Sequence, residues 1–193
     1  MAISVNELAQ TIEQVTLTTA INVGNKGGMK MCKAFYNDTK PLMVKLAEEM
    51  ELSCPFEPSA YKGTGEEERV GIVIRITSEI YDAFAALENH CREQLEADGI
   101  QHVNNLWCSA IRADKYGHTL RCKINIKGER AAYFWDSDGQ LTVPPPELKN
   151  LPINAQVHMR GVNIQKATIG LLADVVSLQY GTEPVEVEKK CPF

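Results

Sequence analysis

Apolar and polar residues alternate most clearly between His118 and Lys127, which predicts an extended strand with one buried face. Gly128-Glu129 then predicts a tight turn into a returning antiparallel strand that ends at Trp135. The apolar face of the first strand consists of Leu120, Cys122, Ile124 and Ile126, and its opposite face consists of Arg121, Lys123, Asn125 and Lys127. On the returning strand, Tyr133 and Trp135 lie on one side, and Arg130, Ala132 and Phe134 lie on the other.

The same period of two recurs in segments 41–46, 69–77 and 155–181, and the last predicts two strands joined near Gln165-Lys166. Segment 17–36 predicts a further hairpin around the Gly-rich run at 24–28. Gly161 and Gly170 are placed where a small barrel needs bulges or bends.

Helical spacing is found twice. Ser4 to Glu7 forms a capping box ahead of a short amphipathic helix. A longer helix is predicted from Ser78 as N-cap to Asp98, with Gly99 as its stop. Its apolar stripe is Ile80, Phe84, Leu87, Cys91 and Leu95, and its predicted exposed side is Glu79, Asp82, Glu88, Glu93 and Glu96.

These elements predict a mainly β chain with some α, organised as one domain with extensions. We expect an N-terminal helix at 1–16, a β-barrel domain at 17–181 and a flexible C-terminal tail at 182–193. No apolar run approaches the roughly 20 residues of a membrane span, and the first residues have no secretory pattern, so we expect a cytoplasmic protein.

The net charge of −5 argues against a partner that is a polyanion, but the charges are sorted along the chain. Five lysines and one acid lie between Lys26 and Lys45, and six basic residues and two acids lie between Arg112 and Arg130. A surface that carries both cations and rings suits a single nucleic-acid strand, because phosphates need counter-charge and bases need a flat surface to stack on. A half-buried hairpin with a solvated polar face has the same alternation, so both interpretations stay open.

The candidate nucleic-acid-binding residues are Lys26, Lys30, Lys33, Arg69, Arg75, Trp107, Arg121, Lys123, Lys127, Arg130, Tyr133, Trp135 and Arg160. Trp107 fits a core position as well as a stacking platform. Phe56 and Tyr61 could anchor their loop to the body of the domain or reach bound bases, and of the two we expect anchoring.

No nucleophile, Walker, dinucleotide or zinc motif is present, so we expect no catalytic residues, no metal site and no cofactor. The six cysteines show no metal-ligand spacing, and Cys91 and Cys122 lie on apolar faces, which indicates small buried thiols in a reducing compartment.

The element order resembles an OB-fold barrel with one helix between its third and fourth main strands. KPLMVKL, RVGIVIRIT, AALENHCREQL, LRCKINIK, GVNIQ and IGLLADVVSLQYG together resemble the single-stranded-DNA-binding proteins of phages and large DNA viruses. The resemblance implies a non-enzymatic protein that coats single-stranded DNA in replication, recombination or repair, in the host cytoplasm if the protein is viral. The terminal Pro192-Phe193 also resembles the partner-recruiting end of such proteins, although Lys189 and Lys190 depart from that acidic pattern.

Two alternatives stay open. The same barrel could bind RNA or a protein partner, or it could hold a small-substrate enzyme pocket near Trp107 and His158. The sequence leaves the oligomeric state open, and self-association is compatible with it.

Overall fold

The computed structural model describes residues 2–23, 29–59, 68–115 and 117–182. Three sequence predictions concern positions outside these residues: Lys26, Tyr61 and the tail that ends in Pro192-Phe193. The helical segments are α1 (Val5–Gln10), a 3₁₀ turn η1 (Ile12–Gln14), α2 (Ser78–Ala97) and α3 (Val103–Leu106). The strands are β1 (Ile3–Ser4), β2 (Val15–Leu17), β3 (Ile21–Asn22), β4 (Met29–Tyr36), β5 (Lys40–Lys45), β6 (Leu52–Ser53), β7 (Arg69–Ile76), β8 (Ile111–Asp114), β9 (Gly117–Asn125), β10 (Tyr133–Trp135), β11 (Leu141–Thr142), β12 (Pro152–Gln165) and β13 (Ile169–Tyr180).

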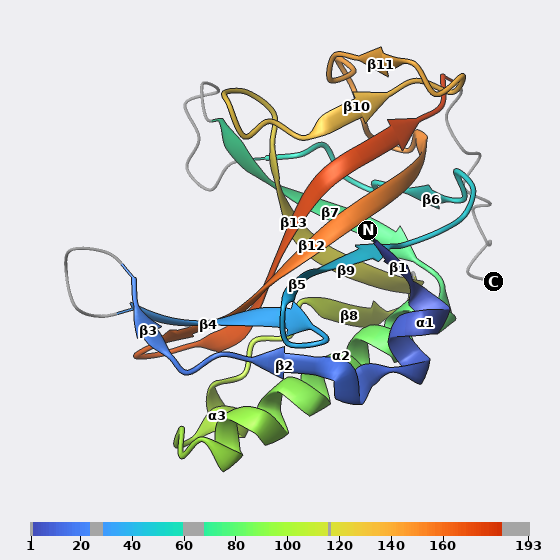
Figure 1. The fold of residues 1–193 in the computed structure, drawn as a ribbon. Helices are drawn as coiled ribbons and strands as arrows, with labels where there is room; N and C mark the ends of the chain where they lie inside the picture. Colours follow the sequence, from blue (N-terminus) through green and yellow to red (C-terminus); the bar gives the residue numbers. More distant parts are fainter. Residues whose placement is uncertain (1, 24–28, 60–67, 116, 183–193) are drawn as a thin grey trace.

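Five of these strands close into a barrel, in the order β12, β6, β7, β9 and β13, with β13 pairing back onto β12 (Figure 1). The β12–β13 hairpin is the longest ladder, and β7 and β9 pair along their whole length. The fold is mainly β and OB-fold-like, as the sequence predicts. The paired alternation of buried and outward residues on β7 and β9 follows from the period-two pattern of their sequences.

The sheet continues beyond the barrel on one side of β12. There β4 and β5 pair with successive parts of β12, β2 and β3 add to β4, and β1 adds to β5. The predicted hairpin across 17–36 is therefore present, with its tip outside the described residues. Helix α1 follows β1, and the Ser4 hydroxyl accepts a hydrogen bond from the Glu7 amide at 3.1 Å, as the capping box predicts.

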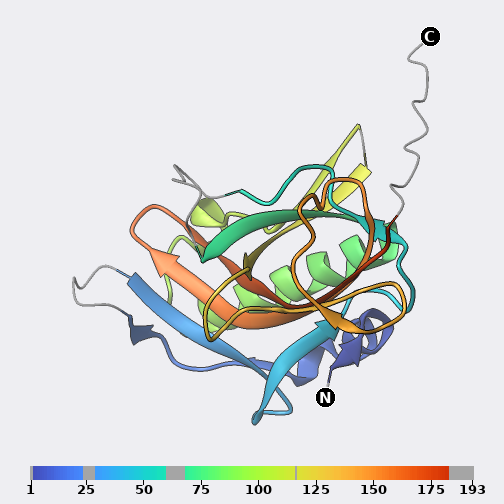
Figure 2. The ribbon, with the colours of Figure 1, turned by 90° about the horizontal axis from the view of Figure 1, so that it is seen from above.

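Helix α2 covers one end of the barrel, and the view from above shows it beneath the ring of strands (Figure 2). Its apolar stripe, including Phe84 and Leu95, is fully buried in the core. The N-cap is Thr77 and not Ser78, because the Thr77 hydroxyl accepts the hydrogen bond from the Ile80 amide. Each large side chain buried here contributes about 1.5–3 kcal/mol of hydrophobic stabilisation.

The predicted hairpin between 118 and 135 is wrong in its pairing. Both edges of β9 are occupied, since β7 pairs with one edge antiparallel, while β8 (antiparallel) and β13 (parallel) share the other. The chain turns at Gly128 (φ +82°) and the Ala132 amide still bonds to the Asn125 carbonyl, but β10 then pairs with β13 and β11. The returning segment therefore adds a two-stranded ribbon at the end of the barrel opposite α2 (Figure 1).

Gly161 allows β12 to bend between its two partners. A register shift lies between Met159 and Gly161, and Gly161 has φ +136°. A Cβ atom at this position would lie 1.8 Å from the carbonyl oxygen of Cys32 on β4. Only glycine fits both the backbone angle and this close approach.

Candidate nucleic-acid interface

Outward side chains from four barrel strands form one continuous surface. The register places His158 of β12 beside Asp174 of β13, Asp174 beside Lys123 of β9, and Lys123 beside Gly71 of β7. The alternate residues of the same strands, such as Val157, point into the core. This strand alternation is why the cations seen in the sequence gather on one side of the barrel.

Two grooves lie on this surface, one of about 800 Å³ and one of about 440 Å³. Arg69 and Asp174 line both grooves, so the two grooves adjoin. We define the basic face as the predicted cations that line them, which are Arg69, Arg121, Lys123, Lys127, Arg130 and Arg160. The structure therefore brings together cations from three strands, β7, β9 and β12, and from the loop after β9.

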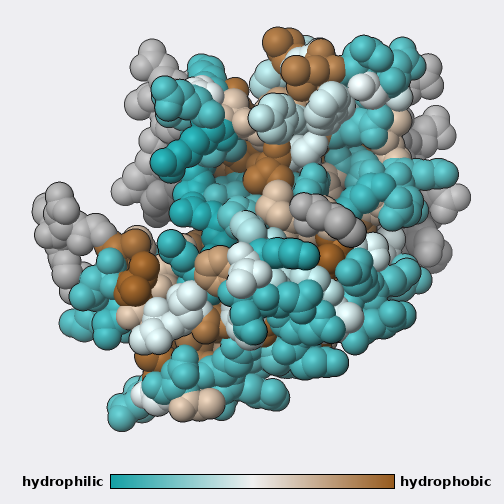
Figure 3. Space-filling view, viewed as in Figure 1, coloured by the Kyte–Doolittle hydropathy of each residue, from teal (hydrophilic) through white to brown (hydrophobic). Residues whose placement is uncertain are grey.

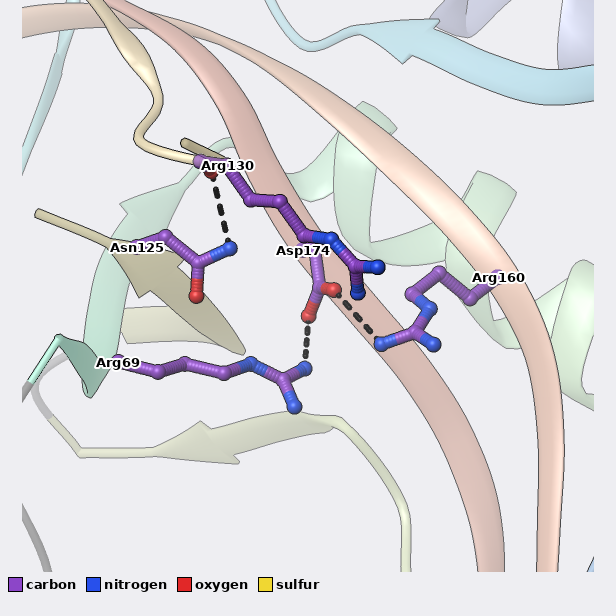
Figure 4. Close-up of polar contacts among 5 residues, drawn as sticks. All are labelled: Arg69, Asn125, Arg130, Arg160 and Asp174. Carbon is purple, nitrogen blue, oxygen red and sulfur yellow. Dashed lines mark hydrogen bonds and ion pairs between the residues drawn. The ribbon is translucent and has the colours of Figure 1, made fainter. Parts of the chain in front are cut away.

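Asp174 lies at the junction of the grooves and was not singled out from the sequence. Its carboxylate forms ion pairs with Arg69 and with Arg160, the latter at 3.2 Å (Figure 4). Arg130 extends toward the same space, and its carbonyl accepts a hydrogen bond from the Asn125 side chain at 3.0 Å (Figure 4). Asp174 thus holds two guanidinium groups from opposite sides of the larger groove.

Other acids moderate the charge of the basic face. Glu68 and Glu129 line the larger groove, and Glu57 lines the smaller one. The Glu57 carboxylate is engaged, since it accepts hydrogen bonds from the amides of Leu148 and Lys149 at 3.0 and 2.7 Å. The surface is therefore positive by a modest excess, which favours a polyanion that makes several contacts over a single small anion.

His158 adds a titratable group to the larger groove. Burial lowers the pKa of the imidazole, Asp174 raises it and Arg160 lowers it, with a net downward shift. Near neutral pH the ring is uncharged, because even the ordinary histidine pKa lies near 6.5.

Aromatic rings lie next to the basic face, on the β10–β11 ribbon. Tyr133 is 62% exposed, and its ring centroid lies 6.4 Å from that of Trp135. The Trp135 indole is half-buried and donates a hydrogen bond to the Ser177 hydroxyl at 2.8 Å. Tyr133 is paired with Ser177 of β13, three positions beyond Asp174, so the strand that carries the rings lies directly beside a strand that lines the grooves.

Phe56 differs from its expected anchoring role. Its side chain is 63% exposed and lines the smaller groove beside Arg121 and Lys123. No regular strand contains Phe56, and the period-two signal that located the other residues is missing at this position.

Trp107 and Glu88 form a structural contact on the α2 side. The Trp107 indole donates to the Glu88 carboxylate at 3.0 Å, and the Ala110 amide donates to the same carboxylate at 2.7 Å. Glu88 is only 4% exposed, so its predicted place on the exposed side of the helix is wrong. Trp107 lines neither groove and lies apart from the basic face.

Three further predicted cations are described and lie apart from the grooves. Lys30 and Lys33 are exposed on β4, which pairs with the far half of β12. Arg75 is half-buried on the outward side of β7, opposite Thr119 and Ser53, and it lines neither groove.

The buried thiols are poor nucleophiles. Burial raises the pKa of Cys54 and of Cys91 to about 12, and it raises the pKa of Cys122 further. Within the described residues, no group of three or more His, Cys, Asp or Glu side chains is arranged to hold a metal ion.

No protein-family model and no curated protein matches this sequence. The structure is similar to that of gp2.5, a single-stranded DNA binding protein encoded by bacteriophage T7, with 12% identity and a TM-score of 0.47 over 79% of this chain and 98% of that one. It is also similar to a C-terminal truncation of the single-stranded DNA-binding protein from bacteriophage Enc34, with 11% identity and a TM-score of 0.47 over 87% of this chain and 98% of that one. The same protein in complex with ssDNA gives 12% identity and a TM-score of 0.45 over 86% of this chain and 98% of that one. These are proteins of the kind that the sequence resembles. The likeness is too distant to carry a function to this chain, so the functional assignment depends on the surface described above.

Proposed function

We propose that this chain binds single-stranded DNA along the basic face and the β10–β11 ribbon. Six cations border two adjoining grooves, and the exposed ring of Tyr133 lies on the strand that pairs with β13 of the larger groove. Phosphates bind the arginines and lysines, and unpaired bases stack on Tyr133, Trp135 and Phe56. The contiguity of cations and rings on one face is the observation that carries this proposal.

Binding is expected to depend little on sequence. Lysine and arginine contacts to phosphate read no base, and stacking accepts every base. The proposed role is a non-enzymatic one, coating single strands during replication, recombination or repair in the cytoplasm, which is the host's if the protein is viral. Within the described residues no helix has both the length and the apolar character needed to cross a membrane.

Salt dependence tests this proposal directly. A fluorescently labelled oligothymidine should bind the full chain, and the logarithm of the association constant should fall linearly with the logarithm of salt concentration, by about 0.7 per phosphate contact. A duplex of the same length should bind less well, because its bases are not free to stack. Equal affinity for duplex and single strand, or no binding at low salt, contradicts the proposal.

A further inference from the structure

An exposed apolar surface is formed by one face of the β10–β11 ribbon. The two strands pair antiparallel, with Trp135 opposite Leu141 and Phe134 opposite Thr142. Directly opposed residues of an antiparallel pair lie on the same face, so Trp135 and Leu141 share one face. Continuing the register places Val143 opposite Tyr133, on that face too.

Three of these four side chains are freely accessible. Tyr133, Leu141 and Val143 are 62%, 63% and 72% exposed, whereas Phe134 on the other face of β10 is 4% exposed. The space-filling view shows apolar side chains gathered over this ribbon (Figure 3). We call the surface of Tyr133, Trp135, Leu141 and Val143 the ribbon platform.

Two hydrogen bonds fix the ribbon platform to β13. The Trp135 indole bonds to Ser177, and the Tyr180 hydroxyl donates to the Val143 carbonyl at 3.1 Å. Both partners belong to β13, a long barrel strand. The platform is therefore a fixed surface, which lowers the conformational entropy that the protein loses when a ligand packs on it.

The platform continues the basic face. Val175 and Val176 of β13 line the larger groove, and the next residue, Ser177, pairs with Tyr133. Arg130, which also lines the groove, precedes Tyr133 by three positions. A strand whose phosphates lie in the groove thus places its next bases and sugars on a surface without charge.

We propose that the ribbon platform makes the protein prefer DNA over RNA, through contact of Leu141 and Val143 with the deoxyribose and with the thymine methyl group. This inference rests on the proposed function and adds a substrate preference to it. Aliphatic side chains offer no partner to a ribose 2′-hydroxyl, and burying a hydroxyl without a hydrogen bond costs free energy. The thymine methyl group instead gains apolar contact on such a surface.

A second copy of the chain is the other occupant that an apolar surface could take. Continuity with the cations of the larger groove favours the nucleic-acid strand, because a self-association surface has no need of that neighbour. The oligomeric state is measured alongside binding, so that this occupant is an outcome of the same experiment.

The test compares oligomers of dT, dU and rU of equal length, about 16 nucleotides, at one salt concentration. The pair dU and rU differs in the 2′-hydroxyl alone, and the pair dT and dU differs in the methyl group alone. We expect wild type to bind dU about tenfold more tightly than rU, which corresponds to about 1.4 kcal/mol, and to bind dT more tightly than dU. In the double variant Leu141→Ser with Val143→Thr, the ratio of dU to rU affinity should fall toward one.

Ile21→Thr is the matched control, since Ile21 is an exposed apolar residue on β3, 46% exposed and outside the ribbon. It should leave the affinity ratio unchanged, and thermal unfolding should show that the double variant remains folded. An equal affinity of wild type for dU and rU, or an unchanged ratio in the double variant, overturns the inference. A double variant that changes only the oligomeric state overturns it in favour of self-association. Failure of wild type to bind dT at all refutes the proposed function instead.

Discussion

Replacing Arg121 and Lys123 together by alanine removes two cations from the basic face without disturbing the core. Both side chains are exposed on the outward side of β9, opposite Val73 and Gly71 of β7, and neither forms an ion pair with a described residue. Exposed substitutions of this kind change stability by about 0.5 kcal/mol or less, so a loss of binding reports the missing contacts.

The size of the effect follows from counterion release. For single strands each phosphate contact contributes about 0.7 to the slope of log affinity against log salt, so losing two contacts flattens the slope by about 1.4. Between about 50 and 200 mM salt, a slope change of this size makes the affinity defect about sevenfold larger at the lower salt.

Anisotropy of a labelled oligothymidine, titrated at several salt concentrations, measures both quantities. Lys40→Ala with Lys149→Ala is the matched control, because it removes the same charge from exposed positions that line neither groove. If the Arg121 and Lys123 variant keeps the wild-type slope, or if the control loses as much, then this face does not hold the phosphates.

Four further outcomes are expected. Asp174→Asn should raise the affinity for oligothymidine and steepen the slope of log affinity against log salt by about 0.7, because it removes the acid that pairs with Arg69 and Arg160. Weaker binding would show instead that Asp174 positions these two arginines for the phosphates. Tyr133→Ala should weaken binding by about 1–3 kcal/mol in the same assay, whereas Tyr133→Phe should not, since stacking needs the ring and not the hydroxyl. Gly161→Ala should lower the free energy of unfolding in urea by at least about 1–3 kcal/mol, because of its φ of +136° and the contact with the Cys32 carbonyl; an unchanged midpoint would refute that strain. Trp107→Phe should destabilise the fold by about 1–3 kcal/mol, because the buried Glu88 carboxylate loses one of its hydrogen-bond donors. The affinity for oligothymidine should stay unchanged; a loss of affinity would show that Trp107 contacts the DNA.

The period-two pattern predicted the strands well, because a strand that is buried on one face requires an apolar residue at every second position. Segment 69–77, the strand from His118 and the pair at 155–181 are all present, and His158 and Arg160 share the outward face as expected. The long helix was also predicted, because its apolar stripe is regular and Gly99 ends it with φ +80°.

Pairing could not be predicted from the same pattern. Alternation tells which way a side chain points and not which strand lies beside it, so the turn at Gly128 suggested a hairpin that does not form. The preference for an adjacent partner was overridden because β7 occupies one edge of β9, and β8 and β13 share the other.

The surroundings of two acids, Asp174 and Glu88, escaped prediction for a related reason. Asp174 lies in an apolar run, and only the fold brings Arg69 and Arg160 to its two oxygens. Glu88 was assigned to the exposed side of its helix, because its burial depends on Trp107 and Ala110, which follow α2 in the chain. Local spacing carries no information on such contacts between distant segments.

A fluorescence titration tests the central claim most directly. In the Trp107→Phe variant Trp135 is the remaining tryptophan, and it lies on the ribbon platform beside Tyr133. Adding oligothymidine should change its emission saturably, with a dissociation constant that rises steeply between low and high salt. An emission that stays constant at low salt, or a change that salt leaves unaltered, would contradict the assignment of single-stranded DNA to this face.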